Sequence, residues 1–387
     1  MSYPSGSGEG GQDIDGGKLK EYSFEIGAIR PPSEGGSFSL LLRVTRNCPW
    51  NRCTFCYGNP YNHARFELRP VAEVKADIDS VKAISDEIKA LSWKLGYDGR
   101  IEPLATVIQS RLLYGKNSQG LTDDELKNYH SVVNVFNWLV AGTKTVFLQD
   151  ADTVVMPTGQ LVEVISYLKA AFPSIERITS YARAKTIFRK KPEELDQLRQ
   201  AGLSRLHVGL ETGDDELLSY VDKGVTAEEH IAAGRKAIAA GFELSVYVMP
   251  GLGGKSRWVQ HARNTARVLS AIDPHFIRLR PFVPRLNTPM LEAYQRQEYE
   301  LSSPRERLEE IKLMIENLEV TSRVCFDHNL NTSYWVGDRL IPLMRQDYNG
   351  YKFPEEKEAV LELINKGLQM NEDAFVSIED MMSRPYL

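Results

Sequence analysis

The chain has 387 residues, of which 42% are hydrophobic and 26% charged, and 47 Lys plus Arg stand against 52 Asp plus Glu for a formal net charge of -5. This composition is close to the soluble globular average, which excludes collagen-like, fully disordered and disulfide-scaffold proteins. The length allows one large α/β domain or two ordinary ones. The mildly acidic balance gives no electrostatic reason to expect nonspecific nucleic-acid binding.

The N-terminal sequence, MSYPSGSGEGGQDIDGG, lacks the cationic and apolar regions of a secretory signal. Its Gly, Ser and acidic content predicts a disordered tail over residues 1–20. No stretch approaches about 18 continuous apolar residues, so we expect no membrane span. Four cysteines are too few for a secreted protein of this length stabilised by disulfides. We therefore expect a cytoplasmic, reducing setting.

Short apolar runs alternate with amphipathic segments from about residue 39 to 281. Six runs are strand candidates, namely SLLLRV (39–44), TVFLQD (145–150), IERITS (175–180), RLHVGL (205–210), ELSVYVM (243–249) and HFIRLR (275–280). Helices are expected between them, at 70–95, around 161–168, from near Pro192, after the Thr226–Glu229 capping box, and near 257–272. This alternation predicts an α/β protein with right-handed crossovers and a parallel sheet. Six units predict a partial (β/α)6, TIM-like barrel.

Two segments fall outside this alternation. Residues 96–141 predict helical pieces inserted before the second strand, within a core domain of residues 21–300. After residue 300, the sequence Ser303, Pro304 and Glu306 predicts a capped helix start. We expect residues 301–387 to form a mainly helical C-terminal extension that covers the barrel mouth.

Cys48, Cys53 and Cys56 lie within nine residues, directly after the first strand. Soft thiolates at this spacing can converge on one metal centre. Four interpretations compete: chance structural cysteines, a zinc site completed by Cys325 or His63, a redox CxxC pair, and a [4Fe–4S] cluster. A redox pair of Cys53 and Cys56 leaves Cys48 without a role, and zinc lacks a second CxxC. A cluster held by three thiolates leaves one iron open to a small molecule.

A strand that leads into CPWNRCTFC, with Phe55 before the last cysteine, resembles the radical S-adenosylmethionine (SAM) superfamily. The usual first spacing in that family is three residues, and here four separate Cys48 from Cys53. Other segments strengthen the likeness: FELRPVAEV, LQDADTVVMP, GLETGDDELLSYVDKGVT and MPGLGG. The sequence is most similar to the subgroup that includes oxygen-independent coproporphyrinogen oxidases, methylthiotransferases and tRNA-modifying enzymes.

The resemblance implies an enzyme whose [4Fe–4S] cluster is held by Cys48, Cys53 and Cys56 and binds SAM at the open iron. An external reductant, such as flavodoxin or ferredoxin, would supply one electron. SAM would then be cleaved to methionine and a 5′-deoxyadenosyl radical, which abstracts hydrogen from a substrate that the sequence does not identify. The alternative is a zinc- or iron–sulfur-binding protein without catalysis, acting as an interaction module or an electron carrier.

The remaining cysteines weaken each named activity of the subgroup. Only Cys325 is left after the first three, which is too few for the second cluster of methylthiotransferases. Tyr57 and Gly58 follow Cys56, so the CxC extension typical of coproporphyrinogen oxidases is absent.

Parallel α/β folds bind ligands at the carboxyl ends of strands, where the resemblance places the SAM contacts. The candidates are Phe55, Asp150, Asp152, Tyr181, Arg183, Glu211, Gly251, Gly253 and Arg280. Carboxylates suit the SAM ammonium, arginine suits its carboxylate, and glycines allow a nucleoside to approach the backbone. Each type also has a structural explanation, as a helix cap, a surface salt bridge or a plain turn.

Asp327 and His328 are candidate catalytic residues in a polar segment that we expect to act as a substrate lid. A histidine can move a proton because its pKa is near neutrality. The structural alternative is a histidine held by internal hydrogen bonds, beside a Cys325 that is only a small buried residue.

Overall fold

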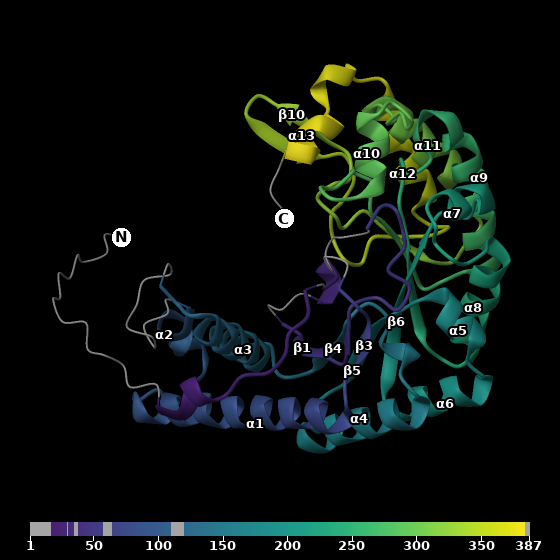
Figure 1. The fold of residues 1–387 in the computed structure, drawn as a ribbon. Coiled ribbons are helices and arrows are strands. Elements are labelled where there is room, and N and C mark those ends of the chain that lie inside the picture. The colour runs from purple at the N-terminus through teal and green to yellow at the C-terminus, as the bar shows by residue number, and fades with distance from the viewer. Residues whose placement is uncertain (1–16, 29, 35–37, 57–63, 110–119, 384–387) are drawn as a thin grey trace.

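The computed structural model describes residues 17–28, 30–34, 38–56, 64–109 and 120–383. Most of the tail expected to be disordered, together with Tyr57, Gly58 and His63, lies outside these residues. Within them, eight strands form one sheet in the order β1-β4-β5-β6-β7-β8-β9-β12 (Figure 1). Their bounds are β1 (Leu40–Arg43), β4 (Thr145–Gln149), β5 (Arg177–Ala182), β6 (Leu203–Glu211), β7 (Glu243–Val248), β8 (Phe276–Leu279), β9 (Arg323–Cys325) and β12 (Tyr351–Lys352).

The sheet is parallel from β1 through β9. All six predicted strands are present, and the α/β class is confirmed. Figure 1 shows the connecting helices along the outer side of an arc of strands, the arrangement of a partial barrel. Two small antiparallel pairs lie outside the sheet, β2 (Thr45–Arg46) with β3 (Glu67–Leu68), and β10 (Ser333–Val336) with β11 (Arg339–Pro342).

Helices connect the strands and follow the last of them. Their bounds are α1 (Val71–Lys94), α2 (Ala105–Gln109), α3 (Asp123–Val140), α4 (Thr158–Ala171), α5 (Ala184–Arg189), α6 (Pro192–Ala201), α7 (Asp215–Tyr220), α8 (Ala227–Ala239), α9 (Gly254–Ile272), α10 (Pro289–Gln295), α11 (Pro304–Glu316), α12 (Lys357–Leu368) and α13 (Ile378–Ser383). The capping boxes predicted at Thr226 and Ser303 both form. The sequence did not predict α5, α7 or α10, because they are too short to show a helical period. No helix in the described ranges is long and apolar enough to cross a membrane.

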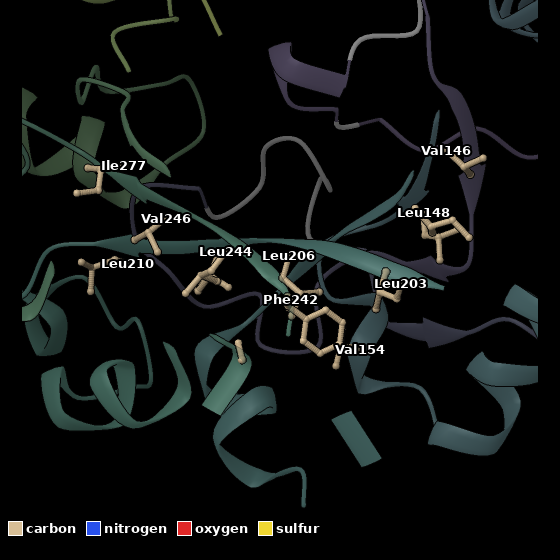
Figure 2. Packing of buried hydrophobic residues seen from close by; sticks show 14 of the residues in the cluster. Val146, Leu148, Val154, Leu203, Leu206, Leu210, Phe242, Leu244, Val246 and Ile277 are labelled. Atoms are coloured by element: carbon tan, nitrogen blue, oxygen red, sulfur yellow. The ribbon is translucent and has the colours of Figure 1, made fainter. Parts of the chain in front are cut away.

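The main hydrophobic core lies between the outer face of the sheet and the helices. Figure 2 shows Leu206 of β6, Leu244 and Val246 of β7 and Ile277 of β8 in this layer. Alternate residues of each strand point outward, because successive side chains of a strand face opposite sides of the sheet. The inner face is left for polar and aromatic residues.

The sheet continues beyond residue 300, where the sequence predicted only the extension. β9 pairs with β8, and β12 pairs antiparallel with β9. These strands have three and two residues, too few to show alternation. The buried stripe of α11 belongs to the same core as the outer face of the sheet. This segment is therefore built into the fold, and its coverage of the barrel mouth stays a prediction.

The edge of β1 is covered rather than exposed. Asn134 of α3 accepts a hydrogen bond from the Leu41 amide at 2.9 Å and donates one to the Ser39 carbonyl at 3.0 Å. The Arg43 amide donates to the Glu25 carbonyl at 3.2 Å. An unpaired edge strand invites aggregation, and these contacts satisfy its backbone. The helical insertion at 96–141 therefore helps to close the open side of the sheet.

Glu34 is buried near the amino ends of the strands of the sheet. Its carboxylate lies 3.1 Å from guanidinium nitrogens of both Arg177 and Arg205 and accepts a hydrogen bond from Thr179 at 3.2 Å. Burial acts to raise the pKa of Glu34, but His207 and the two arginines outweigh it and lower that pKa to about 2. An ionised carboxylate thus joins the segment before β1 to β5 and β6.

Candidate cofactor site and active site

The loop with Cys48, Cys53 and Cys56 follows β1 and is anchored by contacts to distant segments. The Trp50 indole nitrogen donates to the Asp222 carbonyl at 2.6 Å. The backbone of Thr54 accepts from the Met290 amide at 3.3 Å and donates to the Val221 carbonyl at 3.0 Å. The neighbouring Phe55 packs against a second hydrophobic cluster beside α7 and α10. These contacts hold the cysteine loop against the ends of α7 and α10.

The longer spacing between the first two cysteines places Trp50 between two arginines. The guanidinium carbon of Arg183 lies 5.1 Å from the centre of the indole and that of Arg52 lies 4.9 Å from it. These are cation–π distances. Trp50 also fills the space above Gly224, where an added Cβ would lie 2.4 Å from the indole ring. Trp50, which lies between Cys48 and Cys53, thus docks this loop on the segment after α7.

We expect Gly224→Ala to lower the free energy of unfolding by about 1–2 kcal/mol, because the new Cβ meets Trp50 and the backbone φ of +69° disfavours alanine. Iron and sulfide content after reconstitution should fall together with the free energy of unfolding in urea. Gly241→Ala is the matched control, because its φ is +82° but its added Cβ meets nothing nearer than 3.8 Å. Equal behaviour of the two variants would contradict the proposed contribution of Trp50.

The three thiols act on one another and lie beside positive charge. A hydrogen bond with Cys56 lowers the pKa of Cys53 to about 7, and the charges of Lys223 and Arg183 act in the same direction. The shared hydrogen bond and burial raise the pKa of Cys56. Burial raises the pKa of Cys48, and Arg183 opposes the rise. The thiolate form, which binds metals, is thus favoured at Cys53.

The donor set, three thiols in one loop, has the chemistry of an iron–sulfur cluster site. Among the residues described, no three His, Cys, Asp or Glu side chains are grouped so that they could hold one metal ion. Cys325 is buried on β9, and the charges acting on its thiol come from Arg278, Asp327, Asp347 and Arg323 rather than from the other cysteines.

A buried ion pair beside the cysteine loop includes a residue that the sequence analysis missed. Lys223 lies 2.8 Å from the Glu211 carboxylate, and both side chains are nearly buried. The Lys223 ammonium lies 5.5 Å from the centre of the Phe55 ring. Burial acts to lower the pKa of Lys223, but Glu211 and Cys53 outweigh it and raise that pKa. The signal in the sequence is the motif GLETGDDELLSYVDKGVT, which contains both charges, although their spacing alone predicts no contact.

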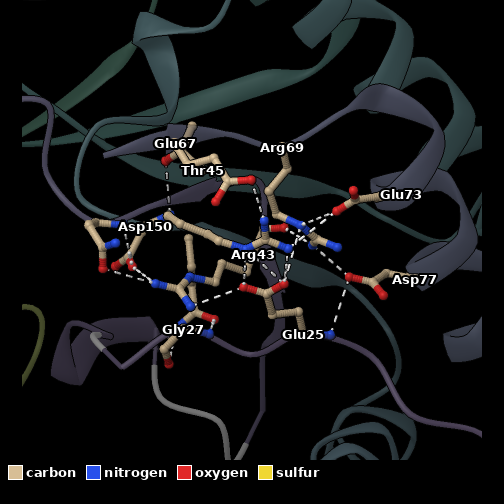
Figure 3. A network of polar contacts seen from close by, with 12 residues as sticks. Glu25, Gly27, Arg43, Thr45, Glu67, Arg69, Glu73, Asp77 and Asp150 are labelled. Atoms are coloured by element: carbon tan, nitrogen blue, oxygen red, sulfur yellow. Dashed lines mark hydrogen bonds and ion pairs between the residues drawn. The ribbon is translucent and has the colours of Figure 1, made fainter. Parts of the chain in front are cut away.

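Asp150 at the end of β4 belongs to a polar network around β1, shown in Figure 3. Its carboxylate accepts from Arg43 at 2.9 Å. Arg43 also pairs with Glu25 at 3.0 Å, and Glu25 in turn contacts Arg69. This network joins the segment before β1 to α1. Asp150 thus has a protein partner, and its contact with SAM stays a prediction.

Asp152 follows β4, and its side chain binds the start of α5, which follows β5. The buried Asp152 carboxylate accepts from the Arg183 amide at 3.2 Å and from the Thr186 hydroxyl. Burial raises the pKa of Asp152 to about 6. The Arg183 guanidinium donates to the Lys223 carbonyl at 2.7 Å. In this structure Asp152 therefore holds the start of α5, which is the structural alternative given above.

The glycines after β7 are packed against C-terminal elements. The Gly251 amide donates to the buried Glu310 carboxylate at 3.0 Å, and the Gly251 carbonyl accepts from the Tyr299 hydroxyl at 2.7 Å. An added Cβ at Gly251 would lie 2.9 Å from the Arg307 guanidinium. Gly253 is buried as well. Close packing explains both glycines, and a nucleoside contact stays a prediction.

Tyr181, Arg280, Asp327 and His328 are brought together near the carboxyl ends of β5 and β8. Burial raises the pKa of Tyr181 and of Asp327, and the Arg280 charge opposes both rises. Burial and Arg280 also lower the pKa of His328 to about 3. Asp327 is paired with Arg278. The predicted residues thus form two groups, one around the cysteine loop and one at the end of β8.

Comparison with known families indicates the class of the central part of this chain. A model of the radical SAM superfamily matches residues 122–265. This part of the chain therefore carries a radical SAM domain, while enzyme activity and cofactors stay proposals for the whole chain. The match begins after the cysteine loop, so the assignment of ligands to individual cysteines remains a proposal. No curated protein matches the chain.

Several solved structures are similar to this chain. Elp3 from the archaeon Methanocaldococcus infernus aligns with 16% identity and a TM-score of 0.41 over 58% of this chain and 55% of its own. The coproporphyrinogen III oxidase of Escherichia coli, described as a radical SAM enzyme, aligns with 18% identity and a TM-score of 0.37 over 45% and 39%. Methylornithine synthase aligns with 15% identity and a TM-score of 0.40 over 92% and 98%. Likeness at this level identifies no substrate for the chain.

Proposed function

We propose that the protein binds a [4Fe–4S] cluster through Cys48, Cys53 and Cys56 and uses it to cleave SAM. When bound, the cluster would supply one electron for cleavage of SAM to methionine and a 5′-deoxyadenosyl radical, which takes hydrogen from the substrate. The observation that carries the proposal is the anchored loop of three thiols with Lys223 and Arg183 beside it.

We assign the amino-acid end of SAM to the Glu211–Lys223 pair. That end carries an ammonium and a carboxylate, so it is complementary to an acidic and a basic side chain 2.8 Å apart. Both charges of the pair act on the Cys53 thiol, which supports a position near the proposed cluster. Asp150 and Asp152 are not part of this assignment, because, among the residues described, no basic side chain beside the thiols pairs with them: Asp150 binds Arg43, and Asp152 binds the backbone amide of Arg183.

Tyr181, Gly251 and Gly253 remain candidates for binding the nucleoside of SAM. Phe55 supports the cysteine loop through its packing against the second hydrophobic cluster. We propose residues 21–300 as the core, with the insertion at 96–141, and 301–387 as the extension. The reductant is a one-electron carrier such as flavodoxin or ferredoxin. All four cysteines are free thiols, which suits the reducing cytoplasm that an exposed iron–sulfur cluster needs.

The test is anaerobic reconstitution, followed by iron and sulfide assays and by EPR of the reduced protein with and without SAM. We expect about four iron and four sulfide per chain, as for one [4Fe–4S] cluster. The EPR signal should shift when SAM is added, because SAM occupies the open iron, and reduction should release methionine and 5′-deoxyadenosine. Bound zinc without sulfide would contradict the proposal. A cluster whose EPR signal does not change when SAM is added would also contradict it.

A further inference from the structure

The inner face of β8 ends in two arginines with different surroundings. Arg278 and Arg280 lie on the same face, because side chains two apart on a strand point the same way. Arg278 is 1% exposed and is paired with Asp327. It also donates to the Ser245 hydroxyl at 3.0 Å. The charge of Arg278 is therefore compensated within the protein.

Arg280 is half-buried and has no such compensation. Its amide donates to the Val248 carbonyl at 2.8 Å, which fixes its position at the end of the sheet. Its guanidinium makes no hydrogen bond or ion pair with any residue that the structure describes. Asp327, which feels the Arg280 charge, is already bound to Arg278. A partly buried cation without an anion is costly unless a ligand supplies one.

His328 belongs to the loop that Asn331 joins to the end of β8, where the charge of Arg280 acts on its ring. Its Nδ1 accepts from the Leu330 amide at 3.2 Å, so the hydrogen of the neutral ring is on Nε2. Burial, Arg280 and Arg285 lower the pKa of His328 to about 3, so the ring is neutral at ordinary pH. Asn331 holds the loop by donating to the Leu279 carbonyl at 2.9 Å. The imidazole is thus a fixed neutral donor.

The charges at the end of β8 act mainly on other groups than those at the cysteine loop. Lys223 and Arg183 act on Cys53, whereas Arg280 acts on Asp327 and His328. Tyr181 lies between the two groups, because Arg280 and Glu211 both act on it. If SAM binds as proposed, its carboxylate lies beside the open iron and is matched by Lys223. Arg280 then remains for a different anion.

We infer that Arg280 and the Nε2–H of His328 bind an anionic group of the substrate, a carboxylate or a phosphate, at the carboxyl end of β8. A guanidinium binds either group through two parallel hydrogen bonds, and a neutral N–H donor adds a third without competing for the anion. The substrate class is therefore an acid or a phosphate ester. This inference rests on the proposed function, because it takes the reaction centre to lie beside the cysteine loop.

The test follows modification of Arg280 by phenylglyoxal at pH 8 in the reconstituted protein, by peptide mass spectrometry and at constant ionic strength set with KCl. We expect saturating acetate or inorganic phosphate to slow modification of Arg280 about fivefold, both with and without SAM, as mass action predicts for an occupied site. The anion that protects Arg280 at the lower concentration shows whether the site prefers a carboxylate or a phosphate. Arg296, which is exposed and paired with Glu298 at 3.0 Å, is the internal control and should react at an unchanged rate.

A second measurement uses thermal unfolding of the reconstituted protein. Acetate or phosphate should raise the melting temperature of the wild type and not of Arg280→Gln, and His328→Gln should weaken the effect. If neither anion protects Arg280 in a cluster-loaded sample, this inference is overturned and the proposed function is not. If SAM without any added anion fully protects Arg280, the inference is also overturned, because Arg280 is then a cofactor ligand. A sample that forms no cluster instead overturns the proposed function, as its iron and sulfide contents will show.

Discussion

Cys53→Ser is expected to abolish cluster assembly, with iron and sulfide falling to background and no EPR signal after reduction. A serine oxygen is a poor ligand for iron in such a cluster, and soft thiolates are what the cluster requires. Cys53 is the buried member of the three and the one whose pKa is lowered. Release of 5′-deoxyadenosine should stop as well, while the far-UV circular dichroism stays unchanged, because Cys53 lies in a loop outside the helices and strands.

Cys325→Ser is the matched control. Cys325 is fully buried on β9, and its thiol can donate to the Tyr348 carbonyl at 3.5 Å, an acceptor that a serine hydroxyl can also use. We expect this variant to keep its full iron content and to lose about 1 kcal/mol of stability. Loss of the cluster in Cys325→Ser would instead favour an electron carrier with four cysteine ligands. A full cluster in Cys53→Ser would contradict the ligand assignment.

Glu34→Gln is expected to lower the free energy of unfolding by about 2–4 kcal/mol, because it leaves Arg177 and Arg205 without their buried counter-charge. Urea unfolding at pH 7 measures the loss. Glu243→Gln is the control, since Glu243 also binds Arg205, at 2.6 Å, but is 36% exposed and should cost less than about 1 kcal/mol. Equal losses in the two variants would show that burial of Glu34 is unimportant.

Lowering the pH should remove the stabilisation that ionised Glu34 provides. The pKa of Glu34 is about 2 in the folded protein, below its ordinary value of 4.5. The unfolded chain therefore takes up the proton first, so the stabilisation is complete above pH 4.5 and is lost as pH falls toward 2. The difference in stability between the wild type and Glu34→Gln should shrink by about 2 kcal/mol between pH 5 and pH 3. A difference that does not change with pH would contradict an ionised Glu34.

Local patterns in the sequence predicted the framework well. The βα alternation predicted six strands and the helices between them, and the capping boxes at Thr226 and Ser303 predicted two helix starts. Three clustered cysteines after the first strand led to the radical SAM superfamily, whose family model matches residues 122–265. These features succeed because each depends on residues within a few positions of one another.

The site could not be completed in this way. Trp50 lies 172 positions from Asp222, to which it donates, and Glu34 lies 145 positions from Thr179. Asp152 has the expected position at a strand end, yet its carboxylate is used by the turn that begins α5. Nothing in the local sequence separates a carboxylate that holds a turn from one that awaits a ligand.

By itself, then, the sequence determined the α/β class, the six strand segments of the core, the likeness to the radical SAM superfamily and the position of the three-cysteine loop. Only the tertiary structure decided how these parts are used: Trp50 docks the longer loop, Lys223 pairs with Glu211 beside the thiols, and β9 and β12 extend the sheet. It also showed that, among the residues described, Arg280 lacks the counter-charge that Arg278 has. The physical reason is that charge compensation and burial are properties of neighbours in space. Those neighbours come from strand ends and loops far apart in the chain, and only the folded sheet brings them to one edge.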